Sequence, residues 1–431
     1  MKNIVTFILG GGKGTRIFPL TKSRSKPAIP IGGKYRIIDV PISNCINSNV
    51  LKIFVLTQFN SKSLNHHINN AYRFDHFSKS FVDILPAEQT HETEHWYQGT
   101  ADAIRRSLKY LDSYPECDKV LILSGDQLYR MDFRDLYRSH MEQQAEVTIA
   151  TCPVSLDSVS EFGIMKVQEK NGLHRITEFV EKPQDPVIIE DFRLPADIQQ
   201  KTGFQDPGKQ HLASMGIYLF NRDVLYRYLQ ETEDHDFGKE VIPRLISERE
   251  VVPYFFDGYW EDIGTIKAFH RANLDLLGKN PNFKLYEVNS PIYTNPRFLP
   301  PACIQGTLSN SIIADGATVL GGTITNSIIG LRSCIAANVN IEDTLIMGAD
   351  WYESDLEKLN AATNNKIPLG IGEGSIIRNA IIDKNVRIGK NVRITNQNNH
   401  QNYDDPNGTY VIKDGIVVIP KGTVIIDNTE V

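Results

Sequence analysis

Four glycines within five positions stand in the segment Leu9-Gly-Gly-Gly-Lys-Gly-Thr-Arg16, near the start of the chain. Backbone beside glycine can approach a ligand closely, and consecutive amides suit the oxygens of a polyphosphate. Lys13, Arg16 and Lys26 add positive charge that would neutralise such a ligand. The segment therefore predicts a binding site for a nucleoside triphosphate.

Two widespread glycine loops do not fit this segment. A Walker loop has Lys followed directly by Ser or Thr, whereas Gly14 separates Lys13 from Thr15. The dinucleotide pattern GxGxxG would require glycine at the position of Thr15. A tight turn without a ligand would need neither four glycines nor three cations. The loop is thus predicted to serve a different class of nucleotide enzyme.

Two aspartates lie in short glycine-containing motifs that suit a metal ion. Asp126 follows an apolar run in Leu123-Ser-Gly-Asp126, and Asp262 lies in Tyr259-Trp-Glu-Asp-Ile-Gly264. Mg²⁺ takes one or two carboxylates and fills its other positions with water and phosphate. Each aspartate alone could equally cap a helix or a turn. Together they predict a Mg²⁺ site facing the triphosphate.

A further group of residues could contact a phosphorylated sugar. Lys182, which Pro183 follows, could reach a phosphate, and Glu181 could accept hydroxyl groups. An isolated Glu-Lys-Pro would more often be a surface turn. The segments Ser214–Tyr218 and His235–Lys239, with Trp260, add polar and aromatic contacts.

The elements that position these residues change character along the chain. Up to about residue 278, apolar runs at 4–9, 53–56, 120–123 and 147–150 predict buried strands, and 99–111 predicts a helix. Alternating strands and helices predict an α/β fold, Rossmann-like, with a mixed, mostly parallel sheet. Ligands of such sheets bind at the carboxyl ends of the strands, where the glycine loop and Asp126 lie.

The C-terminal part has a different repeat. Ile or Val recurs every six residues, as in Ile329, Ile335 and Ile341, with Gly, Asn and Asp between them. This spacing predicts a parallel β-helix, although a set of hairpins is the alternative. Residues 349–369 interrupt the repeat and are predicted to leave the coil on one face. A β-helix cannot cover its own ends, so we expect it to take part in oligomerisation.

These patterns predict three segments: a catalytic domain over 1–278, a proline-containing linker over 279–300 and a β-helix domain over 301–431. With 41% hydrophobic and 23% charged residues, the composition is that of an ordinary soluble protein. A net charge of −6 without a basic block argues against a nucleic-acid or membrane partner. Five scattered cysteines, none in a CxxC pair, and no signal-peptide pattern predict a cytoplasmic location.

With these residues assembled, the chain resembles the ADP-glucose pyrophosphorylases (glucose-1-phosphate adenylyltransferases) of the plant and cyanobacterial type. The similarity spans nearly the whole length and includes GGGKGTR, WYQGTADA, LSGDQLYRMD, FVEKP, ASMGIYLF, DFGKEVIP and YWEDIGT. It implies a nucleotidyltransferase domain followed by a left-handed β-helix, in a homotetramer or a heterotetramer. It also implies the Mg²⁺-dependent conversion of ATP and glucose 1-phosphate to ADP-glucose and pyrophosphate, which supplies glycogen or starch synthesis.

The resemblance also implies a role for individual residues. Catalytic roles fall to Asp126, Arg16 and Lys26, and metal binding to Asp126 and Asp262. Nucleotide binding is implied for Leu9, Gly10, Gly11, Gly12, Gly14, Thr15, Gln58, Gly99 and Thr100. Binding of glucose 1-phosphate is implied for Tyr97, Gly163, Glu181, Lys182, Ser214, Tyr218, Asp236 and Trp260. Lys384 and Lys421 match two lysines associated with an allosteric metabolite, 3-phosphoglycerate, whose action phosphate opposes.

The chain departs from the family pattern at two positions. Asn295 replaces a common arginine, which leaves the strength of phosphate inhibition open, and Gln127 replaces a more usual histidine. Three alternatives also stay open: a related enzyme using UTP, dTTP or GTP; a non-catalytic regulatory subunit; and a hexapeptide-repeat acyltransferase. Arg16 and Lys26 favour an active subunit. An acyltransferase would need a histidine in the repeats, but none lies between His270 and His400.

Overall fold

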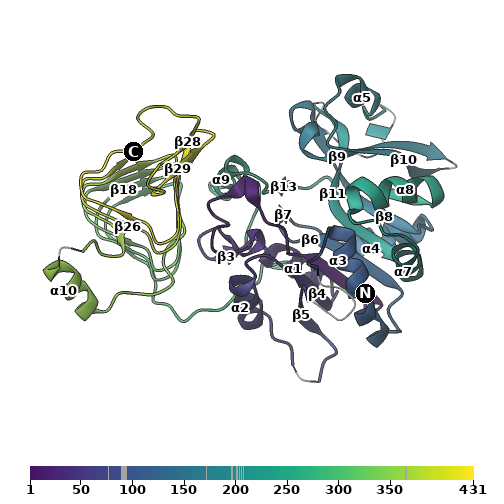
Figure 1. The fold of residues 1–431 in the computed structure, drawn as a ribbon, viewed down its shortest axis with the longest axis horizontal. Coiled ribbons are helices and arrows are strands. Elements are labelled where there is room, and N and C mark those ends of the chain that lie inside the picture. The colour runs from purple at the N-terminus through teal and green to yellow at the C-terminus, as the bar shows by residue number, and fades with distance from the viewer. Residues whose placement is uncertain are drawn as a thin grey trace.

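The computed structural model describes residues 1–75, 77–88, 95–170, 172–195, 198–199, 202, 204, 206, 208–364 and 366–431. A layered α/β part and a β-helix lie side by side in it (Figure 1). Among the residues with a described placement, no helix combines the length and apolarity required to cross a lipid bilayer.

The α/β part is built on one mixed sheet whose main path runs β10-β9-β11-β6-β1-β4-β5. β1 (Ile4–Leu9) lies between β4 (Lys52–Thr57) and β6 (Lys119–Ser124) and is parallel to both. β5 (Phe81–Pro86) continues the parallel half. The other half contains β8 (Val147–Ser155), β9 (Gly163–Lys170), β10 (Leu173–Glu181), β11 (Lys209–Asn221) and β12 (Val251–Phe255).

The two halves of the sheet differ in strand direction. β11 runs antiparallel to β6, β8 and β9, whereas β12 runs parallel to β8. The predicted strands 4–9, 53–56, 120–123 and 147–150 all lie within observed strands and are confirmed. The glycine loop leaves the parallel half, at the carboxyl end of β1.

Helices cover both faces of this sheet (Figure 1). Ile4 and Ile8 of β1 join one buried cluster, and Val5 and Phe7 join another. Because both faces are covered, β1 is apolar at every position except Thr6 and does not alternate between apolar and polar residues. The helices are α1 (Asp39–Asn47), α2 (Lys62–Ala71), α3 (Thr100–Ser107), α4 (Phe133–Glu142), α5 (Pro186–Asp191), α7 (Arg222–Glu231), α8 (Ile242–Glu248) and α9 (Ile266–Leu274).

The helix predicted over 99–111 is only partly α-helical. α3 ends at Ser107, and a 3-10 helix continues over Leu108–Ser113. Leu108 and Leu111 are buried as predicted, while the ring of Tyr110 packs 5.9 Å from that of Phe54. The segment thus continues to pack against the sheet after it changes from an α-helix to a 3-10 helix.

The C-terminal part is a parallel β-helix with three faces. Its first sheet stacks β14 (Cys303–Ile304), β17 (Thr318–Val319), β20 (Cys334–Ile335), β23 (Gly370–Ile371), β26 (Arg387–Ile388) and β31 (Val424–Ile425). The second stacks β15 (Thr307–Ser309), β18 (Gly322–Thr325), β21 (Val339–Glu342), β24 (Ile376–Arg378) and β27 (Arg393–Ile394). The third contains β16 (Ile312–Ile313), β19 (Ile328–Ile329), β22 (Leu345–Ile346), β25 (Ala380–Ile382), β30 (Ile416–Ile419), β29 (Val411–Lys413) and β28 (Asn402–Asp404).

The six-residue repeat points into the interior of this β-helix. Ile329, Ile335 and Ile341 are each at most 1% exposed and pack in the same apolar cluster. At one corner, the amide of Asn310 donates to Asn326 at 2.7 Å, and both residues have positive φ. Stacked strands pair in parallel, so the hairpin alternative is wrong for the coils.

Two excursions leave the coil. The one predicted over 349–369 contains α10 (Asp355–Thr363), which lies on the outer side of the β-helix in Figure 1. A second, between β27 and β30, contains β28 and β29, which pair antiparallel as a hairpin on the third sheet. The six-residue spacing did not predict this hairpin.

The two parts share one apolar cluster. Ile29 and Ile31 of the α/β part belong to the same buried cluster as Ile328 and Ile381 of the β-helix. Residues 275–302, all described, connect the parts without a helix or strand. The β-helix is therefore packed directly against the segment that follows the glycine loop.

Candidate functional site

The glycine loop is held at both ends by hydrogen bonds to its backbone. The amide of Gly10 donates to the carbonyl of Leu56 at 2.8 Å, and the carbonyl of Gly14 accepts from Thr21 Oγ1 at 3.0 Å. Gly14 has φ of +60°, and a Cβ there would lie 2.9 Å from Thr21 Cγ2. Only glycine fits this turn without strain.

Between these anchors the loop is open. The nearest atoms to a Cβ built at Gly12 are more than 4 Å away, and Lys13, Thr15 and Arg16 are exposed. The loop therefore offers unhindered backbone and two exposed cations at the carboxyl end of β1, the arrangement that suits a phosphate chain.

A small two-stranded sheet brings Asp126 and Asp262 together. Asp126 lies between β6 and β7 (Gln127–Tyr129), and Asp262 ends β13 (Trp260–Asp262). β13 runs antiparallel to β7 with Asp262 opposite Gln127. Residues 136 positions apart in the chain thereby reach one point beside the glycine loop, where the amide of Gly125 donates to the carbonyl of Leu9 at 3.1 Å.

Lys26 lies between the two carboxylates. Its Nζ is 2.7 Å from Asp126 Oδ2 and 3.4 Å from Asp262 Oδ1. Burial opposes the charge of Lys26, but the two carboxylates outweigh it and raise its pKa. Burial also opposes ionisation of Asp126, yet the Lys26 ammonium lowers its pKa, with help from the Ser124 hydroxyl.

The pKa of Asp262 shifts in the opposite direction from that of Asp126. Burial raises its pKa, the attraction of Lys26 opposes that shift, and repulsion from Asp126 adds to it. Arg16 also lies close to Asp262. A Cβ built at Gly264 would lie 3.1 Å from both Arg16 Nη2 and Asp262 Oδ2. Two carboxylates in one place thus repel each other and are balanced by cations.

The carboxylates of Asp126 and Asp262 fit a magnesium ion. Among the described residues no group of three or more His, Cys, Asp or Glu could hold a metal. Mg²⁺ needs only one or two carboxylates when phosphate oxygens complete its shell. Asp126 and Asp262 supply two, and the Lys26 ammonium already lies between them as a cation.

A second polar cluster forms around Glu181 at the end of β10. Glu181 Oε1 is 3.7 Å from Lys182 Nζ, and burial raises the pKa of Glu181. A Cβ at Gly163 would lie 2.3 Å from Phe179 Cζ and 2.6 Å from Glu181 Oε2, so glycine keeps both the Phe179 ring and this carboxylate in place. Lys182 itself has φ of +50°, which turns the chain sharply after the strand.

Asp236, Thr100 and Tyr218 complete this cluster. Asp236 Oδ1 accepts from the amides of Gly238 and Lys239 at 3.0 and 3.1 Å, and Thr100 Oγ1 donates to Oδ2 at 3.4 Å. Burial raises the pKa of Tyr218 to about 12, with the charges of Glu181 and Asp236 acting in the same direction. The phenol therefore remains a neutral donor.

β11 joins the two clusters. Ser214 Oγ accepts from the amide of Gly216 at 3.2 Å. A Cβ built at Gly216 would lie 3.8 Å from the Cβ of Ser124 on β6. Ser124 in turn contacts Asp126. β11 (Lys209–Asn221) thus runs from Ser214 and Tyr218 of the predicted sugar-binding set past Ser124, which contacts the predicted metal ligand Asp126.

Three other predicted residues lie around this surface. Gln58 Nε2 donates to the carbonyl of Tyr97 at 3.5 Å. Gly99 begins the turn into α3, where the amide of Ala101 donates to the carbonyl of His235 at 2.8 Å. These contacts hold residues 97–101 between the glycine loop and the Asp236 cluster.

Trp260 faces the site from β13. Its indole Nε1 donates to Gln127 Oε1 at 3.2 Å, and its ring centroid is 4.8 Å from that of Phe162. Gln127 therefore fixes the ring of Trp260 through its amide oxygen.

Lys384 and Lys421 lie elsewhere, on the β-helix. Both donate to Asp350, Lys384 Nζ to Oδ1 at 2.6 Å and Lys421 Nζ to Oδ2 at 2.8 Å. Burial lowers the pKa of Lys384 to about 8; Asp350 opposes the shift, and repulsion from Arg36 and Arg24 adds to it. The two lysines thus form a cationic cluster separate from the glycine loop.

Sequence reasoning missed the residues that link this cluster to the α/β part. Arg24 Nη2 makes two bonds to Asp383, at 2.8 and 3.1 Å, and their side chains are 3% and 1% exposed. Asp350 was also missed. Asp383 directly precedes Lys384, and Asp350 is the second residue of the excursion predicted over 349–369, so only proximity in sequence could have suggested them.

Comparison with known families gives two matches. Residues 5–279 match the family described as nucleotidyl transferase. Residues 297–430 match a domain described as the GLGC left-handed parallel beta-helix domain. The first match covers more than half of the chain and contains every residue of the glycine loop and the two polar clusters.

Proposed function

This chain belongs to the nucleotidyl transferase family, and we propose that it is a glucose-1-phosphate adenylyltransferase. The two family matches support a coarser assignment, a sugar-1-phosphate nucleotidyltransferase. ATP as nucleotide, glucose 1-phosphate as acceptor and ADP-glucose as product are our proposal. The observation that carries it is Lys26 between Asp126 and Asp262, beside an open glycine loop and in continuity with the Glu181 cluster.

The proposed reaction is a direct displacement. A phosphate oxygen of glucose 1-phosphate attacks the α-phosphorus of ATP, and pyrophosphate leaves on the opposite side. No side-chain nucleophile is required, so the protein needs to position two anions and offset their repulsion. Arg16 and Lys26 would stabilise the triphosphate and the departing pyrophosphate. Lys182 would hold the sugar phosphate.

Other residues would bind the two substrates. The glycine loop (Leu9, Gly10, Gly11, Gly12, Gly14 and Thr15) with Gln58, Gly99 and Thr100 would hold the nucleotide. The sugar would lie against Glu181 and Asp236, whose carboxylates accept hydroxyl groups, and against Tyr218, whose phenol stays protonated. Asp126 and Asp262 would hold Mg²⁺, which screens phosphate charge when bound.

We further propose that Lys384 and Lys421 bind an anionic effector and that the enzyme works in the cytoplasm as a tetramer. The pairing of both lysines with one carboxylate supports an affinity for phosphate-type anions. Near Asn295, burial lowers the pKa of Arg297, Asp39 and Asp350 oppose that shift, and Arg297 Nη1 donates to the carbonyl of Asn295 at 3.0 Å.

The test is a panel of nucleotides. Purified protein is given glucose 1-phosphate, Mg²⁺ and one of ATP, UTP, dTTP or GTP, and pyrophosphate release is measured with and without 3-phosphoglycerate. We expect ATP to give the highest rate and EDTA to stop the reaction. A preference for another nucleotide would replace the proposed substrate, and no release with any nucleotide would indicate a non-catalytic subunit.

A further inference from the structure

Asp350 occupies the site that the two β-helix lysines form. Its carboxylate accepts from Lys384 Nζ at 2.6 Å, Lys421 Nζ at 2.8 Å and Asn385 Nδ2 at 2.9 Å. Its own amide donates to Asn385 Oδ1 at 2.8 Å. Two ammonium groups and an amide around one carboxylate form the donor set that a free oxyanion would use.

The surroundings of this carboxylate are otherwise positive. Arg36 and Arg24 both repel the charge of Lys384. The Asp383 carboxylate accepts from the backbone amide of Lys384 at 2.6 Å, but among the described residues its ion pair is with Arg24 and not with either lysine ammonium. The charge of Asp350 therefore holds this cluster together, and its pKa is far below the ordinary value because Lys384 and Lys421 outweigh burial.

Asp350 is also the point where the chain leaves the coil. Ala349 remains part of the coil, with its amide donating to the carbonyl of Leu331 at 2.8 Å, and α10 begins five residues after Asp350. Further along the excursion, Glu353 pairs with Arg387 at 2.6 Å. The excursion is thus attached to later coils by two sets of ion pairs, one of which involves the proposed effector lysines.

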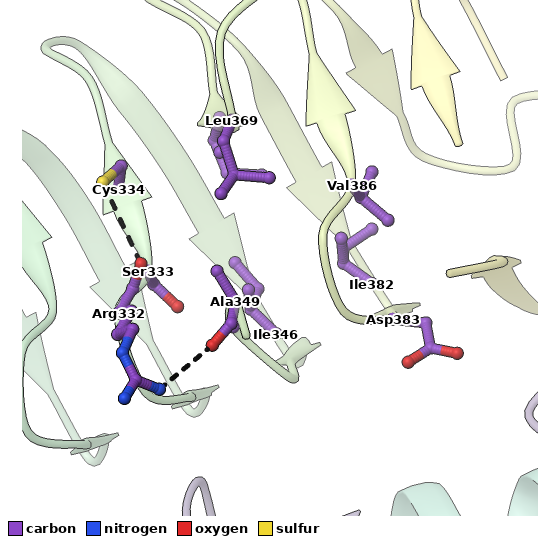
Figure 2. Close-up of a pocket in the computed structure, with 12 residues that line it drawn as sticks. Arg332, Ser333, Cys334, Ile346, Ala349, Leu369, Ile382, Asp383 and Val386 are labelled. Carbon is purple, nitrogen blue, oxygen red and sulfur yellow. Dashed lines mark hydrogen bonds between the residues drawn. The ribbon is translucent and has the colours of Figure 1, made fainter. Parts of the chain in front are cut away.

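An incoming anion must reach this cluster from the surface. Figure 2 shows a small cavity beside this cluster, lined by Ala349 and Asp383, where Arg332 donates to the carbonyl of Ala349. Its volume is about 20 Å³, which is room for a water molecule and not for a phosphate ester. Asp350 and Lys421, in contrast, have side chains 33% and 35% exposed.

We propose that Asp350 is a tethered counter-anion that fills the Lys384–Lys421 site until an anionic metabolite displaces it, which releases the start of the excursion from the coil. This inference rests on the effector site of the proposed function. A carboxylate attached to the chain competes at a high effective concentration. It therefore raises the concentration of free anion needed to occupy the lysines.

The test compares Asp350→Asn with Asp355→Asn in the full-length protein. The first substitution keeps the shape of the side chain but not its charge, whereas Asp355, on α10, pairs only with the exposed Lys358 at 3.8 Å among described residues. Inorganic phosphate is the probe, and its binding is measured by calorimetry without nucleotide. We expect about tenfold tighter binding to Asp350→Asn and no change for Asp355→Asn.

Trp351 provides a second readout in the chain with its native Asp350. In a Trp96→Phe/Trp260→Phe background, Trp351 is the one emitter, because the chain has three tryptophans. We expect phosphate to shift its emission, and the joint Lys384→Ala/Lys421→Ala change to abolish the shift.

Equal or weaker phosphate binding to Asp350→Asn, or a Trp351 signal that phosphate leaves unchanged, would overturn the inference. Neither readout requires turnover. A protein that releases no pyrophosphate but shows the expected binding would therefore contradict the proposed function and not the inference.

Discussion

The two ionic clusters of this molecule have opposite compositions. Beside the glycine loop, one lysine lies between two carboxylates, Asp126 and Asp262. On the β-helix, one carboxylate lies between two lysines, Lys384 and Lys421. Counted over these three residues in each cluster, the first has one more carboxylate than ammonium group and suits a cation, whereas the second has one more ammonium group than carboxylate and suits an anion.

The pKa values of the lysines express this difference. Lys26 is buried, but two carboxylates raise its pKa. Lys384 is buried too, yet one carboxylate cannot offset burial and the charges of Arg36 and Arg24, so its pKa falls to about 8. Contact with an aspartate is therefore not enough to predict a lysine's charge; the whole neighbourhood decides it.

The largest expected effect comes from removing one charge of the first cluster. Asp126→Asn should lower turnover on the order of a thousandfold, since a preorganised electrostatic partner of the phosphates is lost. Pyrophosphate release at saturating substrate measures the effect. Asp132→Asn is the matched control, because Asp132 caps α4 through the amide of Arg134 at 2.9 Å. Turnover near that of the unmodified protein in Asp126→Asn would rule out its metal role.

The next effect concerns the ion pair that joins the α/β part to the coil beside the second cluster. Asp383→Asn leaves Arg24 charged and unpaired in a buried position, which should lower the free energy of unfolding by about 3 kcal/mol. Denaturant unfolding of the full chain measures it. Asp404→Asn, which removes the more exposed pair with Lys413, should cost at most about 1 kcal/mol. Equal losses of unfolding free energy in both variants would show that burial of the Arg24–Asp383 pair adds nothing to its effect on stability.

The pH dependence of activator binding should reveal the lowered pKa of Lys384, which Lys26 of the first cluster does not share. Lys384 is charged below pH 8 and loses its charge as the pH rises through that value, so anion binding should weaken above it. The half-activating concentration of 3-phosphoglycerate should rise by up to about tenfold between pH 8.5 and 9.5. Lys384→Arg should remove this dependence, because arginine stays charged there. A dependence that survives in Lys384→Arg must come from another group.

The smallest effect is expected at Lys421, whose side chain is partly exposed. Lys421→Ala should raise the half-activating concentration about two- to fivefold, the range of a single exposed ion pair. The rate without activator should stay constant, since Lys421 contacts Asp350 and not the glycine loop. The measurement is an activation curve for both proteins, and an unchanged curve would argue against a role in activation.

Local patterns predicted much of the fold. β1 is apolar at every position except Thr6 because both its faces are buried, and Ile329, Ile335 and Ile341 repeat because each fills the interior of one coil. The hairpin of β28 and β29 escaped prediction. Its segment departs from the six-residue period and pairs antiparallel at the edge of β30.

For the candidate site, motifs indicated the residue types and the structure supplied their pairing. The sequence indicated Asp126, Asp262 and Lys26, but not that Lys26 lies between the two carboxylates. Arg24 and Asp350 went unrecognised, because their partners, Asp383 and the two lysines, lie 34 or more positions away in the chain. Such long-range pairs carry no periodic signal.

The coils of the β-helix accept extra chain without losing alignment. Ile324 pairs with Ile341, 17 positions later, whereas Ile335 pairs with Ile371 and Ile382 with Ile419, 36 and 37 positions later. Each excursion thus lengthens one coil by about twenty residues while the same side chains still meet inside. An insertion in such a coil therefore changes only the outer surface, so segments can be added or removed there without disturbing the ladder of interior side chains.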